Sequence, residues 1–514
     1  MADTVERFRR LTGRKGGKPL VPARPPVPPR EMALVGLLLA NVLWLAFALG
    51  GVRLWGEFTA LALSVGTLLL LPRWKSGEIE GPASPAIRLL KLPLFWCGLG
   101  LYAAFFIQSW NLSWRYVIHH GSPAIMGVDP LVPWLPTGLD TPLEESNPFR
   151  CMTYYAIPWL ACCTAWAGLA TRRAVGWMLH GLALIGVAFA FVALRQHFLD
   201  SELILGIFQT ARTRVGTDIP FWGTLINPNH GAFFLILANG LCLGLFLSGW
   251  HRDLRQFKHR GGAWLLYLGL AFLCSFAVLM AQARGAIGFL VLQWILFVFI
   301  CTVFFLKRFG LVGLLLPGFL FMVALEIGIT FVVNPDVYEQ QREEWIRTFD
   351  LVENPELEAR YYMLQIAGDL LVRKPWYGHG GGSWRYVHLP VLADYPDFHT
   401  ERISWKRNEV TGKRERQTTV IWFQNAHVDL LEYLVEWGIV GCLFPVLAGL
   451  WLLYRGIRSF RGWDVGLATI LMSVLVVFLG TIVEFHFRIP LVLLVWCLMF
   501  TLTIKLVDLN AGAL

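Results

Sequence analysis

The chain has 514 residues, of which 56% are hydrophobic and only 15% are charged, and its mean hydropathy is +0.55. Soluble domains carry about 25% charged residues, so this composition excludes a soluble enzyme with a single anchor and indicates a polytopic membrane protein. The formal net charge is +9, but no basic stripe is interleaved with surface aromatic residues, so we expect no nucleic-acid partner.

Apolar runs long enough to cross about 30 Å of hydrocarbon as helix recur along the chain. They predict an all-α polytopic membrane protein with about twelve transmembrane helices. The predicted spans are residues 32–50, 54–72, 90–109, 152–170, 175–194, 223–248, 263–281, 286–306, 310–333, 431–454, 465–483 and 489–506.

Basic residues predict the orientation of these spans. With the N-terminus inside, the inner segments carry 24 Lys and Arg, against eight in the short outer segments and twelve in residues 334–427. This bias is the positive-inside pattern, and it also suits contact with anionic lipid. We therefore expect a basic, Pro-rich cytoplasmic tail at residues 1–31, spans one to nine within 32–333, a large outer loop at 334–427, and spans ten to twelve with a short C-terminus at 428–514.

Polar residues stand at the outer ends of several spans. Arg284 lies almost alone between two apolar stretches, and an arginine at mid-bilayer costs roughly 3 kcal/mol. It either snorkels to lipid headgroups or faces water, a carboxylate or a bound anion; Gly285 and the short turn favour the second reading. Asn227 and Pro228 predict a capped helix start, which accounts for most of the Asn-Pro-Asn-His sequence, although His230 could also line a polar cavity.

The outer loop at 334–427 carries 14 Asp and Glu against 12 Lys and Arg, and it predicts a small folded cap with helical content. Residues 357–375 predict an amphipathic helix that a proline stops. The run Gly378-His-Gly-Gly-Gly382 could approach phosphate through backbone N–H groups, but it lacks a P-loop lysine and is also typical of a flexible turn. Residues 406–416 predict a solvated, charged hairpin.

His427 ends this loop where the tenth span begins. In isolation it could be a histidine buried by packing at a helix N-terminus. An imidazole with a pKa of about 6.5 accepts a hydroxyl proton at neutral pH, and nearby positive charge keeps it neutral, as a base requires. Arg212, Arg214 and Arg284 share the outer side, and two or three arginines bind a diphosphate and stabilise it as a leaving group. These residue types suit transfer of a group from a diphosphate to a hydroxyl.

At this point the chain resembles the O-antigen ligase and polymerase superfamily of bacterial envelope glycosyltransferases, over about residues 200–500. The resemblance rests on the order, spacing and shared outer placement of four segments, with the large loop between spans nine and ten. These segments are Arg212–Ala232, Gln282–Gly285, Arg360–Gly382 and Asn425–Gly441. The first three spans and residues 110–150 lie outside the resemblance.

The resemblance implies a fold of the membrane GT-C type. It implies transfer of a glycan from undecaprenyl diphosphate to a sugar hydroxyl of lipid A–core, on the periplasmic side of the bacterial inner membrane, by an enzyme that needs no metal or other cofactor. It makes His427 the candidate general base and assigns the diphosphate to arginines, with Arg284 first, then Arg212 or Arg214, then Arg360. Further candidate substrate-binding residues are Asn229, His230, His379, Gly380 and Arg488.

Other functions remain open at the level of sequence. An O-antigen or exopolysaccharide polymerase and a protein O-oligosaccharyltransferase would use similar residues and differ only in the acceptor. A transporter of lipid-linked sugar would need the arginines but no base; inverted repeats are expected in many transporters, and none is evident in this chain. A membrane scaffold of an envelope-assembly complex would leave the outer arginines without an anion to bind.

Overall fold

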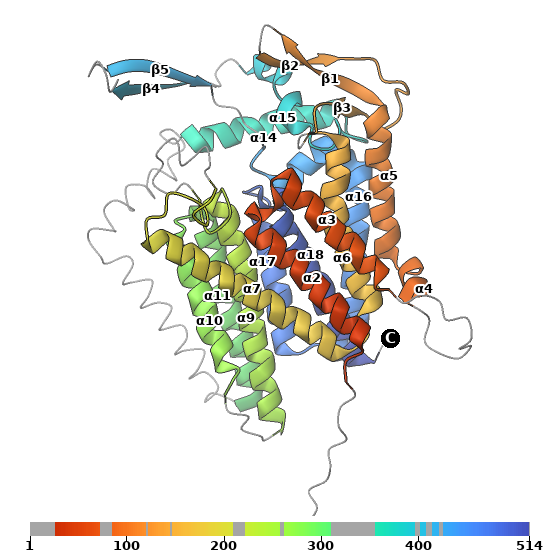
Figure 1. The fold of residues 1–514 in the computed structure, drawn as a ribbon, viewed down its shortest axis with the longest axis vertical. Helices are drawn as coiled ribbons and strands as arrows, with labels where there is room; N and C mark the ends of the chain where they lie inside the picture. Colours follow the sequence, from red (N-terminus) through yellow and green to blue (C-terminus); the bar gives the residue numbers. More distant parts are fainter. Residues whose placement is uncertain are drawn as a thin grey trace, which may run out of the picture.

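The computed structural model describes residues 26–71, 85–119, 122–143, 146–208, 221–256, 262–309, 355–395, 401–407, 414–420 and 425–512. These residues are mostly helical (Figure 1). Six helices are long and apolar enough to cross a membrane, and they are α2 (Pro29–Phe47), α7 (Arg172–Phe198), α9 (Pro228–Gln256), α11 (Arg284–Phe309), α16 (Asp429–Arg458) and α18 (Pro490–Ala511). The molecule is therefore a polytopic membrane protein, as predicted.

Further helices occupy the remaining predicted ranges that the structure describes. They are α3 (Leu54–Leu69), α5 (Pro93–Trp110), α6 (Pro148–Gly168), α10 (Leu265–Met280) and α17 (Val465–Gly480), with a short α4 (Pro85–Leu90) before α5. The predicted ninth span, 310–333, lies outside the described residues, so the number of spans stays a prediction.

Side-chain caps explain several of these helix starts. Asn147 accepts the backbone N–H of Phe149 at 3.0 Å before α6, and Thr171 accepts that of Ala174 at 3.2 Å before α7. Asp464 does the same for α17. Such caps satisfy backbone donors that the first helical turn leaves unpaired. The predicted cap of the sixth span is confirmed, because Asn227 Oδ1 accepts the Asn229 N–H at 3.0 Å.

Small residues let the central helices approach closely. Helix α9 is the most buried of the six long helices, with 94% of its apolar window inside the protein. A side chain at Gly240 would overlap Ser473 of α17, and one at Gly244 would overlap Ile470 of the same helix. Packing of this kind supplies attraction between helices where lipid removes the hydrophobic driving force.

The fold is not purely helical, and this corrects the all-α prediction. Strands β1 (Leu112–His119), β2 (Ser122–Gly127) and β3 (Gly138–Asp140) form a sheet in the order β2-β1-β3, antiparallel and then parallel. Strands β4 (Glu401–Arg407) and β5 (Arg414–Val420) pair antiparallel, which confirms the predicted charged hairpin. Residues 112–116 alternate between apolar or aromatic and polar side chains, a period-two pattern that favours a strand.

One end of the helices carries a folded cap, defined here as residues 355–395. It contains α14 (Pro355–Arg373), α15 (Trp384–Val387) and the 3₁₀ turn η3 (Pro390–Asp394), and α14 confirms the predicted amphipathic helix. Figure 1 shows α14 and both sheets at the end of the molecule opposite the C-terminus. The buried core of the cap includes Ala426 and Val435, so the cap packs directly on the segment that begins α16.

Candidate functional site

His427 lies just before the first turn of α16, as predicted, in an uncommon backbone conformation. Its φ is +58°, in the left-handed region that few residues other than glycine adopt. The ring packs edge-on against Phe485, with centroids 4.8 Å apart. Its Nδ1 is buried, and among the described residues no group hydrogen-bonds to it. Burial, and then the positive charge of Arg360, lower the pKa of His427 to about 4, so the ring is neutral at pH 7.

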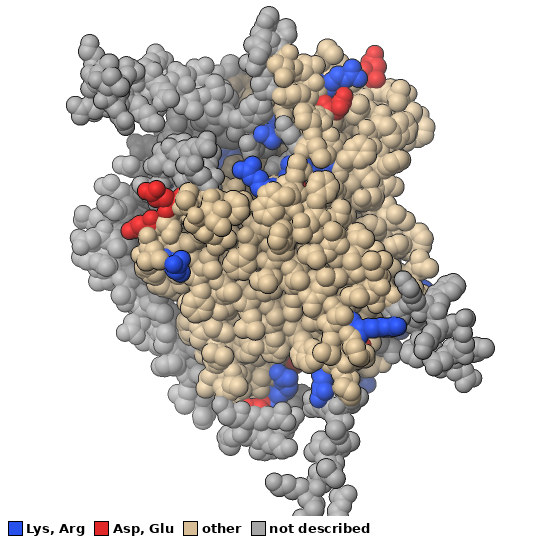
Figure 2. Space-filling model, viewed as in Figure 1, with Lys and Arg blue, Asp and Glu red and all other residues tan. Residues whose placement is uncertain are grey.

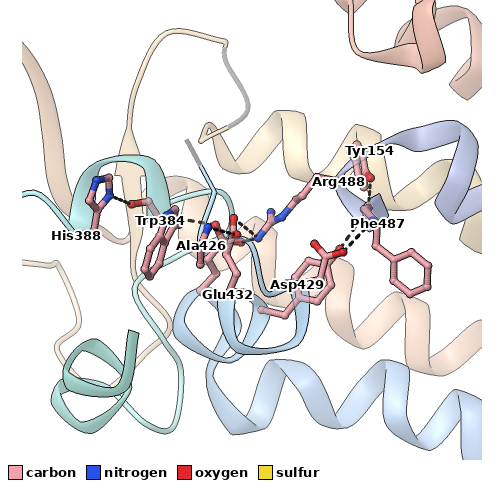
Figure 3. A network of polar contacts seen from close by, with 10 residues as sticks. Tyr154, Trp384, His388, Ala426, Asp429, Glu432, Phe487 and Arg488 are labelled. Atoms are coloured by element: carbon pink, nitrogen blue, oxygen red, sulfur yellow. Dashed lines mark hydrogen bonds and ion pairs between the residues drawn. The ribbon is translucent and has the colours of Figure 1, made fainter. Parts of the chain in front are cut away.

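A carboxylate of α16 fixes the peptide beside His427. Glu432 accepts the backbone N–H of Ala426 through Oε2 at 2.8 Å and binds Arg488 through Oε1 at 3.0 Å. Arg488 also binds Glu436 at 2.7 Å and lies over the ring of Tyr433. Figure 3 shows Arg488 reaching Glu432 next to Ala426. The guanidinium thus pairs with two carboxylates that would be costly to bury without a cation beside them.

Asp429, Glu432 and Glu436 form one acidic face of α16. Their spacing of three and four residues places them on the same side of a helix, and all three are buried. Each holds a different backbone segment. Asp429 accepts the Phe487 N–H at 2.8 Å, and Glu436 accepts the Trp384 N–H of the cap at 3.2 Å. The acidic face of α16 therefore joins the His427 peptide, the cap and the segment between α17 and α18.

A second cluster gathers around Glu484. Its Oε1 accepts the Asn229 amide at 2.8 Å and pairs with Arg360 at 3.2 Å, and Arg360 also donates to the backbone of Val483 at 3.1 Å. His230 packs edge-on against Phe485 at 4.8 Å, the same distance as His427. Four predicted site residues, Asn229, His230, Arg360 and His427, are thereby brought together around Glu484 and Phe485.

Arg284 is the first residue of α11, and its side chain is exposed. Five residues later in α11, Phe289 lies 5.7 Å from Phe233 of α9, which in turn stacks on His486 at 4.0 Å. Arg284 is therefore at the same end of the helices as the Glu484 cluster. Arg212 and Arg214 lie outside the described residues.

The predicted glycine run has a structural use. Helix α16 is interrupted at Gly438, whose φ and ψ are 64° and −175°. Residues 375–380 fill this break: the N–H groups of His379 and Gly380 donate to Val435 and Glu436, each at 2.9 Å. In return, the N–H groups of residues 439 and 440 donate to the carbonyls of residues 375 and 376, at 2.9 and 3.0 Å. We call this exchange of four hydrogen bonds the backbone splice.

The splice leaves little room for phosphate at the glycine run. The next N–H, of Gly381, donates to Gln108 at 3.1 Å, and His379 is buried with Nε2 2.9 Å from the Leu370 carbonyl. Burial lowers the pKa of His379 to about 4. The contacts of His379 and Gly380 thus lie within the protein, and we leave both out of the site proposed below.

A pocket opens beside the His427 segment. It is lined by Gly51, Val52, Glu57, Arg150, Cys151, Tyr154, Tyr155, Gly382, Arg385, Asn425, Glu432, Glu436, Arg488 and Pro490. Figure 2 shows basic side chains in a hollow between the helices and the sheet at the top of this view. Within the described residues, no group of three or more His, Cys, Asp or Glu side chains is arranged to hold a metal ion.

Comparison with known protein families gives a match for this chain. Residues 269–446 match the family model described as O-antigen ligase. Over this segment the chain is similar to the O-antigen ligase family. This confirms the resemblance to the superfamily and supports an enzymatic role in glycan processing. A search of curated proteins gave no match.

The segment that matches the family model includes only part of the site. Arg284, Arg360 and His427 fall within residues 269–446, whereas Asn229 and Arg488 fall outside. The sequence prediction also missed the roles of several residues, namely Asp429, Glu432, Glu436, Glu484 and Phe485. One pattern could have found the first three: acidic residues recurring on one face of a predicted span are rare and are usually paired and functional.

Proposed function

We propose that this protein is a periplasmic-face glycosyltransferase that moves a glycan from undecaprenyl diphosphate to a hydroxyl of lipid A–core. The observation that carries the proposal is His427, a buried and neutral imidazole held in a left-handed conformation beside Arg360. The match of residues 269–446 to the O-antigen ligase family supports the same class of reaction.

In the proposed reaction, a ring nitrogen of His427 takes the proton of the acceptor hydroxyl. The hydroxyl oxygen then attacks the anomeric carbon of the donor glycan. The bond from that carbon to the diphosphate oxygen breaks, and undecaprenyl diphosphate leaves with the electron pair. The negative diphosphate also opposes the effect of Arg360 and raises the pKa of His427, so the ring becomes a stronger base once the donor is bound.

Arginines bind the leaving diphosphate in this proposal. The Arg360 side chain is about one-third exposed, and its Nη2 pairs with Glu484. A guanidinium carries five N–H groups, so this contact uses only some of the donors of Arg360. Arg284 is exposed at the same end of the helices. We assign the remaining contact to Arg212 or Arg214. The positive-inside bias of the sequence supports a periplasmic site with cytoplasmic termini, and residues 334–427 then form the periplasmic loop.

The test is a transfer assay with full-length protein in detergent, labelled undecaprenyl-diphosphate glycan and lipid A–core, with and without EDTA. We expect wild type to transfer glycan in EDTA and His427→Ala to lose at least about a hundredfold in kcat, the usual contribution of a general base. His180→Gln is the matched control, because His180 lies on α7 and its ring hydrogen-bonds Tyr267 of α10, away from the described cluster.

The identity of the product separates the remaining alternatives. Glycan on lipid A–core supports the ligase assignment, whereas lengthened glycan or glycosylated protein would move the enzyme to the polymerase or protein-glycosylating branch. Full transfer by His427→Ala would show that His427 is not the general base. Movement of donor lipid across vesicles without any transfer would favour a transporter.

A further inference from the structure

We propose that the pocket bounded by Glu57, Arg150 and Arg385 is a subsite for sugar hydroxyl groups of the acceptor. This inference rests on the proposed function, because it names where the second substrate of that reaction binds. The argument uses the charge of the pocket wall, its hydrogen-bonding groups and its position relative to His427.

The charge of the wall suits a neutral ligand. Among the residues that line the pocket, three arginines face three glutamates. Arg150 pairs with Glu57 at 3.0 Å, and Arg488 pairs with both Glu432 and Glu436. A diphosphate needs a surplus of positive charge, which this wall does not offer. A polyhydroxylated, uncharged saccharide needs no such surplus.

The hydrogen-bonding groups match sugar hydroxyls. A hydroxyl both donates and accepts, a carboxylate accepts and a guanidinium donates, so alternating Glu and Arg side chains serve both functions of each hydroxyl. Arg150 is held in place by Glu57 and by the Val52 carbonyl at 2.8 Å, which lowers the entropic cost of binding. Tyr154 and Tyr155 add aromatic surface to the wall.

The position of the pocket favours the acceptor over the donor. Asn425 in its wall is two residues from His427, and Glu432 in its wall holds the Ala426 N–H. Arg360, the proposed diphosphate contact, instead binds Glu484 and Val483, which do not line the pocket. A saccharide in the pocket thus lies beside the His427 segment, on a wall separate from the diphosphate contacts.

Much of the wall also lies outside the segment that matches the family model. Seven lining residues come from positions 51–155 and two from positions 488–490, whereas the family model matches residues 269–446. The base and Arg360 fall inside the matched segment. A wall built mainly from the rest of the chain suits the substrate that differs most among enzymes of shared donor chemistry, which is the acceptor.

The experiment measures binding of a soluble probe, a neutral oligosaccharide of core sugars that carries neither phosphate nor carboxylate. Its Kd is measured on full-length protein in detergent for wild type, Arg385→Gln and Glu57→Gln. We expect each substitution to weaken binding about three- to tenfold, the loss of one hydrogen bond. Arg373→Gln is the matched control, because Arg373 is an exposed cap arginine paired with Asp394 on the surface, and it should bind as wild type does.

Two further measurements test whether the pocket is separate from the diphosphate site and whether it serves the acceptor. Inorganic pyrophosphate should leave oligosaccharide binding unchanged if the pocket is separate from the diphosphate site. In the transfer assay, Arg385→Gln should raise the KM for acceptor and leave the KM for donor within about twofold.

If wild type binds the oligosaccharide but transfers no glycan, the proposed function fails and the binding site stands. Equal affinities in all four proteins, no binding to wild type, or displacement by pyrophosphate would overturn the inference.

Discussion

The left-handed backbone of His427 gives its ring a fixed direction. For a non-glycine residue this conformation costs about 1–3 kcal/mol and persists only where neighbours enforce it. The neighbours are identifiable: Glu432 holds the preceding N–H, and Phe485 packs against the ring. Hydropathy and residue type were sufficient to single out His427 from the sequence. The recurring acidic residues of α16 could have marked Glu432 as important, but its contact with the Ala426 N–H was not predictable, because it depends on which backbone group the carboxylate reaches.

We predict that Glu432→Gln slows transfer without unfolding the protein. The amide keeps the shape of the side chain but weakens a charge-assisted hydrogen bond to Ala426, so kcat should fall about ten- to a hundredfold while the KM for donor stays unchanged. Steady-state kinetics with Asp394→Asn as an exposed control would measure this. Equal losses in kcat and in melting temperature for both variants would show a general effect on the fold instead.

The pH dependence of activity reports on His427. Because its pKa lies near 4 in the free protein, the ring stays unprotonated down to about pH 5, and it loses the ability to accept a proton only below that. We therefore expect kcat/KM, which titrates the free enzyme, to be flat between about pH 8 and 5.5. An inflection near pH 6.5 that disappears in His427→Ala would show an ordinary, solvated histidine and contradict the burial described above.

Among the elements, α16 contributes the most to the site. Its acidic face binds three separate segments, and its break at Gly438 admits the backbone splice. The sequence predicted a span here from its apolar residues, and helices were found in every predicted range that the structure describes. Neither the splice nor the three-stranded sheet was predicted, because both depend on backbone pairing between distant segments rather than on hydropathy along one segment.

We expect Gly438→Ala to destabilise the protein by about 2 kcal/mol or more, since its φ of 64° and ψ of −175° are nearly restricted to glycine. An added Cβ would also lie 2.4 Å from the Trp376 carbonyl group. Gly449→Ala in the same helix is the control, because nothing lies within 4 Å of its added Cβ. The melting temperature in detergent should drop for the first variant and hold or rise for the second; equal values would show that the break tolerates a side chain.

At the scale of the whole molecule, buried histidines outside the spans link stability to pH. The pKa values of His379 and His427 are lowered from 6.5 to about 4, so the unfolded chain binds more protons than the folded chain between these values. Stability is therefore complete above about pH 6.5 and is lost as the pH falls toward 4.

At pH 5, each of the two histidines should cost about 2 kcal/mol of stability relative to pH 7. We expect the melting temperature of wild type to fall steadily from pH 7 to pH 5, and that of His379→Gln to fall less, because glutamine does not titrate. A wild-type melting temperature independent of pH would show that both rings titrate normally.

The backbone splice also determines whether the cap can be exchanged independently of the membrane helices. A cap that only rested on the membrane helices could be deleted or exchanged for that of a relative. Here, removal of residues 375–380 would leave two carbonyls and two N–H groups of α16 without partners, and each buried, unsatisfied group costs about 1–3 kcal/mol. A chimaera should therefore fold only if the incoming cap is transferred together with the matching part of α16 around Gly438. The cap and this part of α16 should accordingly be inherited together.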